Sequence, residues 1–193
     1  MSGQTKRQQL QMVWPEDRLD APPDWPAPPG YTLRTSRPED AAAHARLLVE
    51  AGLGSWDAAR SARLMDAALP QGLFFAVCDR DGAIAATAVA QRDALPNHPQ
   101  GGELGWVAAS NAHRGKGLGG CVSAAATRRF LEAGCRDIFL RTDDGRLPAI
   151  KTYLKIGYLP FLFAPDMEER WQAVCRELGL DFDALGAIRK TQA

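Results

Sequence analysis

The stretch HRGKGLGG, residues 113–120, places three glycines at the spacing G-x-G-x-x-G. Glycines let backbone N–H groups approach an anion closely, and a helix that begins here would direct its free N–H groups and positive dipole end to the same point. Arg114 and Lys116 add positive charge. A diphosphate suits this chemistry, because its several oxygens accept hydrogen bonds from successive donors. The alternative is that the glycines form only a turn between a strand and a helix.

The same spacing occurs in dinucleotide-binding proteins, but the surrounding sequence argues against one. That site needs a turn directly after a strand and an acidic residue about 20 residues further on, at the end of the next strand. Here the preceding strand pattern fades near Ala109, and Asp137 begins the next strand instead of ending it. The G-x-x-x-x-G-K-[ST] pattern of a P-loop is absent as well. A nicotinamide dinucleotide is therefore the less favoured ligand.

Two segments together resemble the GNAT superfamily of acyl-CoA-dependent N-acetyltransferases. ELGWVAASNAHRGKGLGG is similar to the family's strand–loop–helix signature R/Q-x-x-G-x-G/A, with Arg114, Gly117 and Gly119 in its fixed positions. AIKTYLKIGY is similar to its second signature, A-I-x-x-Y-x-K-x-G-F/Y. The two occur in the family's order with a strand between them. The helix expected after residues 158–163, in place of a final hairpin strand, resembles some single-domain relatives of mycothiol synthase, a likeness of fold alone.

The resemblance implies acetyl-CoA (coenzyme A) as co-substrate. It implies that loop N–H groups hold the pyrophosphate and that the backbone of residues 107–109 pairs with the pantetheine arm. The implied cofactor-binding residues are Val107, Ala108, Ala109, Arg114, Gly115, Lys116, Gly117, Leu118, Gly119, Gly120 and Arg146. The chain departs from the family at Arg146, where Asn is common, and at Asn111, where Pro is common.

Acyl transfer to an amine needs an acid for the departing thiolate and donors for the developing oxyanion. The resemblance implies that Tyr153 is the acid and that the Ala109 N–H is an oxyanion donor. A phenol with a pKa of about 10 stays protonated at neutral pH. Tyr153 also shares an apolar helical face, and the alternative is that packing on this face is its only role. Glu103 is a candidate general base, because even spacing on a strand puts it on the same face as Val107. A solvated carboxylate at a strand end is the alternative.

Substrate contacts are expected from the loop between the first two helices. Trp56 and Asp57 are candidates for an apolar and a cationic group of the acceptor, and an ordinary buried Trp56 is the alternative. The three histidines, His44, His98 and His113, lack metal-ligand spacing, so no metal is expected.

These residues need elements to position them, and hydrophobic periodicity predicts such elements. The expected strands cover residues 31–35, 73–78, 83–90, 103–109, 137–142 and 158–163. The expected helices cover residues 36–51, 55–69, 118–134, 146–157 and 165–179, and Ser36 and Glu39 are expected to form a capping box for the first. The fold class is α/β (α+β), with a splayed, mixed, mostly antiparallel GNAT-like sheet flanked by helices.

Residues 1–29 differ from the remainder, because APPDWPAPPG holds five prolines in ten residues. Such a segment forms neither a helix nor a central strand. We expect a proline-rich arm over residues 1–29 and an acetyltransferase domain over residues 30–193. Trp14 and Trp25 are costly to leave in water, which favours docking of the arm onto the domain or onto a second subunit.

Composition narrows the partners. Lys plus Arg and Asp plus Glu number 23 each, so no overall basic field attracts nucleic acid or a membrane surface. The four cysteines form no C-x-x-C pair, and with no apolar leader a cytoplasmic location is expected. The sequence thus predicts an N-acetyltransferase that transfers acetyl from acetyl-CoA to a primary amine of a small molecule or protein by direct attack in a ternary complex. The alternative is a non-catalytic CoA-binding sensor or interaction module. A homodimer is compatible with either.

Overall fold

The computed structural model describes residues 8–190. Residues 1–7 of the predicted arm and 191–193 of the predicted domain lie outside the described residues. The strands are β1 (Leu10–Val13), β2 (Tyr31–Thr35), β3 (Ala68–Cys78), β4 (Ile84–Arg92), β5 (Gly102–Ala109), β6 (Ile138–Thr142), β7 (Leu159–Leu162) and β8 (Ile188–Arg189). The α-helices are α1 (Ala41–Glu50), α2 (Ala58–Ala67), α3 (Leu118–Glu132), α4 (Leu147–Ile156) and α5 (Met167–Leu178).

The strands of residues 8–190 form one mixed sheet in the order β2-β3-β4-β5-β6-β1-β7-β8. Its pairs are antiparallel except for β5 with β6 and β7 with β8, which are parallel. β5 and β6 pair only where Gly102 and Glu103 meet Ile138 and Phe139, and beyond that point no ladder joins them. The sheet is therefore splayed between β5 and β6, and the predicted mixed α/β fold is confirmed.

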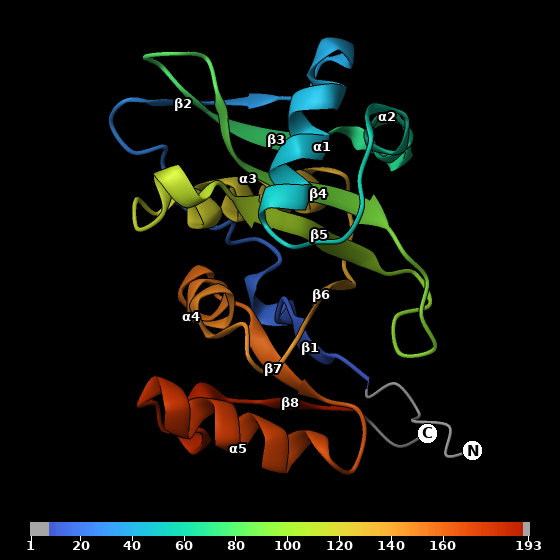
Figure 1. Ribbon diagram of the computed structural model, residues 1–193. Helices are drawn as coiled ribbons and strands as arrows, with labels where there is room; N and C mark the ends of the chain where they lie inside the picture. The colour runs from blue at the N-terminus through green and yellow to red at the C-terminus, as the bar shows by residue number, and fades with distance from the viewer. Residues whose placement is uncertain (1–7, 191–193) are drawn as a thin grey trace, which may run out of the picture.

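Helices cover both faces of this sheet (Figure 1). On one face, Leu47 and Leu48 of α1 pack with Ala108, and Leu64 of α2 packs with Leu73 and Phe75. On the other face, apolar residues of α3, α4 and α5 join the largest core cluster, which includes Leu104 of β5. Helix α3, which follows the glycine loop, thus lies on the face opposite to the α1–α2 connection.

β1 is an interior strand of the sheet, although it precedes the proline-rich stretch. It lies between β6 and β7 and is antiparallel to both. Leu10 and Met12 are fully buried in the largest core cluster. The segment does not alternate strictly, because Met12, Val13 and Trp14 are consecutive apolar residues, so the sequence indicated only an extended arm here.

Three local expectations need correction. The predicted capping box of Ser36 and Glu39 is wrong, because Asp40 instead accepts a 2.7 Å hydrogen bond from the Arg37 N–H and also pairs with the Arg34 guanidinium. A 3₁₀ turn, Pro38–Asp40, then precedes α1. The second helix ends at Ala67, because Ala68 already pairs with β4. After α5 the chain adds the short edge strand β8, which no sequence pattern had indicated.

Within residues 8–190, no helix combines the length and the apolar composition needed to cross a bilayer.

Candidate active site

The glycine loop has a backbone conformation that glycine adopts without strain. Gly115 and Gly117 both have φ of +77°, in the left-handed region where a side chain would be strained. Gly117 is the N-cap of α3, and its carbonyl accepts the first helical bond, from the Cys121 N–H. The N–H groups of residues 118–120 precede that bond, so they have no partner within the helix. They are the donors that the sequence predicted for an anion.

A cavity of about 630 Å³ lies against this loop. Its walls come from the arm, the end of β5, the loop, the start of α3, and α4. The lining residues are Trp25, Ala51, Val107, Ala108, Ala109, His113, Arg114, Gly115, Lys116, Gly117, Leu118, Gly119, Gly120, Arg146, Pro148, Ala149, Lys151, Thr152, Tyr153 and Lys155. The structure thus brings all the predicted cofactor residues, and Tyr153, to one cavity.

The charge of this lining is one-sided. It holds the cationic side chains of Arg114, Lys116, Arg146, Lys151 and Lys155, and no carboxylate is among the described residues that line it. The chain as a whole has equal numbers of acidic and basic residues. The cavity is therefore a local cationic site on a protein without net charge, which suits a ligand with several phosphate groups.

Side chains outside the cavity hold the loop in place. The Tyr31 hydroxyl lies 2.7 Å from His113 Nδ1 and accepts a 2.7 Å hydrogen bond from Lys116 Nζ. The Glu50 carboxylate accepts hydrogen bonds from the Ser110 hydroxyl at 3.0 Å and from the Asn111 N–H at 2.6 Å. Proline at position 111 could not donate this last bond, which gives a physical reason for the departure at Asn111.

A β-bulge shapes the strand that the pantetheine arm was expected to pair with. Gly105 pairs with Val89 and Ala108 with Thr87, so β5 has one residue more than β4 in this interval. Trp106 absorbs the extra residue with φ of +51°. Past the bulge, the edge of β5 that faces β6 carries no strand partner. An extended ligand segment can pair with that edge.

Tyr153 lies on α4 and lines the cavity. Its side chain is 5% exposed, and burial raises the pKa of its phenol to about 12, opposed by the nearby charge of Arg146. Among the described residues, none forms a hydrogen bond with the Tyr153 hydroxyl. The phenol is therefore a neutral donor at the cavity wall throughout the physiological pH range.

Glu103 lies elsewhere. Arg141 holds its carboxylate through Nε at 2.7 Å and Nη2 at 2.9 Å, and Gln91 Nε2 donates to it at 2.8 Å. The expectation from even spacing is wrong, because the bulge between Glu103 and Val107 reverses the alternation. Val107 packs against the core cluster of the α3 face, to which Leu104 belongs, whereas Glu103 points to the opposite face and does not line the cavity.

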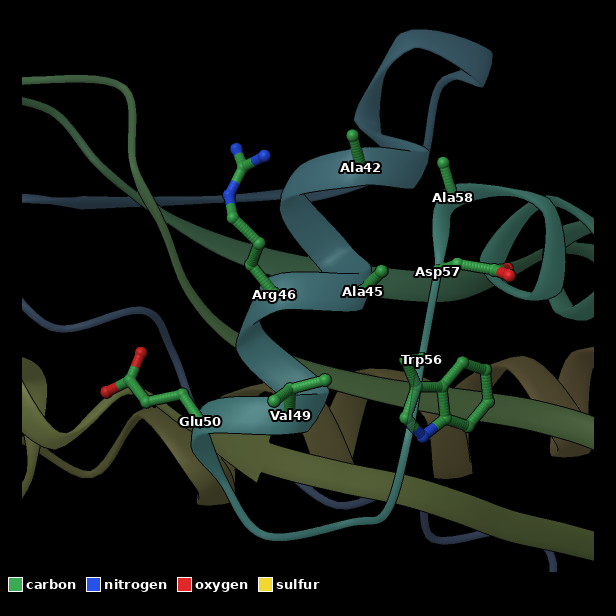
Figure 2. Close-up of a pocket in the computed structure, with 8 residues that line it drawn as sticks. All are labelled: Ala42, Ala45, Arg46, Val49, Glu50, Trp56, Asp57 and Ala58. Atoms are coloured by element: carbon green, nitrogen blue, oxygen red, sulfur yellow. The ribbon is translucent and has the colours of Figure 1, made fainter.

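Trp56 and Asp57 line a separate, open hollow of about 440 Å³ beside α1 (Figure 2). The Asp57 carboxylate caps α2 by accepting a 2.6 Å hydrogen bond from the Arg60 N–H. The Trp56 ring meets Trp106 edge-to-face with centroids 4.7 Å apart, and the Arg60 guanidinium lies 4.0 Å from its centroid. These two residues therefore do not line the 630 Å³ cavity, although Trp56 packs in one apolar cluster with Ala51 and Ala108, which do.

Sequence reasoning missed one wall of the cavity, Trp25. A Cβ built on Gly120 would lie 2.5 Å from the Trp25 indole, so the arm packs directly on the start of α3. The only available signal was the cost of leaving a tryptophan in water, which indicated docking without a location.

Across the part of the chain that the structure describes, no three His, Cys, Asp or Glu side chains are grouped so that they could hold a metal ion.

Comparisons with known proteins agree with this geometry. Mycothiol acetyltransferase of Corynebacterium aurimucosum is 32% identical over 111 residues, which cover 54% of this chain and 36% of that protein. The match thus spans little more than a third of the relative's length. A GCN5-related N-acetyltransferase from Sphaerobacter thermophilus superposes with a TM-score of 0.62 at 24% identity, over 80% of this chain and 49% of that one. A second GCN5-related N-acetyltransferase, from Kribbella flavida, superposes with a TM-score of 0.54 at 22% identity, over 80% of this chain and 55% of that one.

At these identities the solved structures show the fold alone. The family-level evidence is a sequence model of the acetyltransferase (GNAT) family, which matches residues 10–158 and so includes β1, the glycine loop and Tyr153. The chain belongs to the GNAT family of acetyltransferases.

Proposed function

We propose that this protein transfers the acetyl group of acetyl-CoA to a primary amine of a small molecule or protein, within a ternary complex. The observation that carries the proposal is the shared cavity, in which the glycine loop, the open edge of β5 and the Tyr153 phenol meet. Family membership supports acetyl transfer in general. The class of acceptor and the roles of individual residues are proposed from the geometry of the cavity.

Two parts of the cavity suit acetyl-CoA: the start of α3 suits its phosphates, and the open edge of β5 suits its pantetheine arm. The cationic lining and the free N–H groups at the start of α3 suit the phosphates, and neither Gly115 nor Gly119 has an atom within 4 Å of where a Cβ would stand. The open edge of β5 suits the amides of the pantetheine arm. Acetyl-CoA, when bound, supplies the activated thioester carbonyl.

In this proposal the amine nitrogen attacks the thioester carbonyl carbon, the carbon–sulfur bond breaks, and the sulfur leaves with the bonding electrons. The Tyr153 hydroxyl donates its proton to that sulfur. The Ser110 N–H bonds back to Ala85 on β4, so by strand alternation the Ala109 N–H points to the opposite edge, toward the splay. We assign it to the carbonyl oxygen as negative charge develops there.

Trp56 and Asp57 are retained as proposed acceptor contacts, on the α1–α2 side of the sheet. Glu103 is proposed to act on the amine only through water, because Arg141 and Gln91 occupy its carboxylate. The proposal thus gives proton donation to Tyr153 and leaves amine deprotonation to solvent or to a water held at Glu103.

The test is incubation of the protein with acetyl-CoA and an amine library, with free thiol release and product mass spectrometry as readouts. At least one amine should release thiol faster than water does and gain one acetyl group. Acetyl-CoA binding without any acetylated product across small amines and peptides would contradict the proposal and favour a CoA-binding sensor.

A further inference from the structure

The proline-rich arm contributes to the cofactor cavity as well as to the sheet. Trp25 is half-buried and lines the cavity with the glycine loop. A Cβ built on Gly120 would meet three atoms of the indole between 2.5 and 2.8 Å, and one built on Gly117 would lie 3.5 Å from Trp25 Nε1. The indole N–H therefore lies beside the start of α3, where the backbone N–H groups have no partner within the helix.

Two contacts fix the arm in the segment just before Trp25. The Arg18 guanidinium donates to the Gly157 carbonyl at the end of α4 at 2.8 Å. After Arg18, the Pro23 carbonyl accepts a 3.2 Å hydrogen bond from Arg128 of α3. The arm thus bridges the two helices that form opposite walls of the cavity. Its prolines restrict the backbone, so little further entropy is lost when the segment orders around a ligand.

The chemistry of this position is specific. An indole N–H is a donor only, and among the described residues no hydrogen bond uses that of Trp25. Its N–H, beside the cationic loop, can donate a hydrogen bond to an anion. The small volume of Gly120 is what admits the ring this close to α3.

We propose that Trp25 is a cofactor-binding residue, whose indole N–H donates a hydrogen bond to a pyrophosphate oxygen of coenzyme A while its ring closes the cavity over the loop. This inference rests on the proposed use of acetyl-CoA.

The test is calorimetric titration of CoA into the wild type and Trp25→Phe, which keeps an aromatic ring against Gly120 and removes the N–H. Loss of a hydrogen bond to a charged group should weaken CoA binding roughly 10-fold or more. Trp171→Phe, on α5 and outside the cavity, is the matched control, because the indole N–H of Trp171 has no hydrogen-bond partner among the described residues; it should leave CoA affinity unchanged. Pantetheine, which has no pyrophosphate, should bind Trp25→Phe and the wild type equally. Equal CoA affinity of Trp25→Phe and the wild type would overturn the inference.

A double-mutant cycle gives an independent test. Gly120→Ala introduces a Cβ whose three nearest neighbours are atoms of the indole, so it should displace the ring and weaken CoA binding. In a Trp25→Ala background the same change should cost nothing further. An equal loss in both backgrounds would overturn the inference. Failure of the wild type to bind CoA would instead contradict the proposed function, so the two failures are distinguishable.

Discussion

Replacing Tyr153 with Phe separates a proton donor from a packing residue. The change removes one oxygen and keeps the ring, which packs near Tyr158 with centroids 6.4 Å apart. A packing role therefore predicts a stable, active variant. An acid role predicts slower chemistry with acetyl-CoA affinity retained, by the ~10²–10⁴-fold typical of general acid–base groups.

The pH dependence follows from the environment of the phenol. Burial raises the pKa of Tyr153 to about 12, so at pH 9 only about one molecule in a thousand has lost the proton. The rate that depends on this acid should hold through pH 10, where an ordinary phenol would be half ionised. It should fall only as the pH approaches 12. A fall in the rate centred near pH 10 would mean that the phenol is solvated during the reaction.

The assay is a single-turnover measurement with an amine identified in the library screen, because product release can mask the chemical step. Wild type and Tyr153→Phe are compared from pH 7 to pH 11 with acetyl-CoA limiting. Acetyl-CoA affinity, measured separately, serves as the control for an intact cavity. Equal single-turnover rates would refute the role of Tyr153 and leave protonation of the thiolate to water or another donor.

Three further changes test other parts of the account. Gly117→Glu should abolish acetyl-CoA binding, since it puts bulk and negative charge at the pyrophosphate position. Gly117→Ala, the control, shares the backbone strain at φ +77° without the charge. An equal loss of affinity in calorimetry for both variants would mean that the charge is not the cause. Glu103→Gln should slow single turnover less than Tyr153→Phe, because Arg141 and Gln91 already occupy the carboxylate; a larger effect would make Glu103 the direct base. Burial lowers the pKa of His44 to about 4 from its usual 6.5, so only the unfolded chain takes up this proton between those values. The corresponding stability is complete above pH 6.5 and is lost as the pH falls to 4, by roughly 3 kcal/mol at 1.36 kcal/mol per pH unit. In urea titrations across this range, His44→Gln should show a flatter pH dependence than the wild type, and an unchanged slope would contradict this origin.

Local patterns predicted the turn of the glycine loop into a helix. The positions of Gly115 and Gly117 depend on backbone freedom within a few residues, and the following helix supplies the donors by itself. Sequence spacing therefore carries almost all of the information needed for this part of the site.

The errors and omissions involve contacts between distant segments. The bulge at Trp106 depends on pairing with β4 and reverses the face of every later residue of β5. Even spacing alone therefore put Glu103 and Val107 on the same face, which is wrong. Trp25 reaches the cavity because β1 inserts between β6 and β7 and so fixes where the arm begins. Neither pairing leaves a local signal in the sequence.

Thermal unfolding with and without ligand tests whether the cavity of the glycine loop and Tyr153 binds acetyl-CoA. At 100 times its dissociation constant, a ligand that binds only the folded state adds about 2.7 kcal/mol to the free energy of unfolding. Acetyl-CoA should therefore raise the melting temperature of the wild type and leave that of Gly117→Glu unchanged, and NADH should raise neither. A shift with NADH and none with acetyl-CoA would contradict the account.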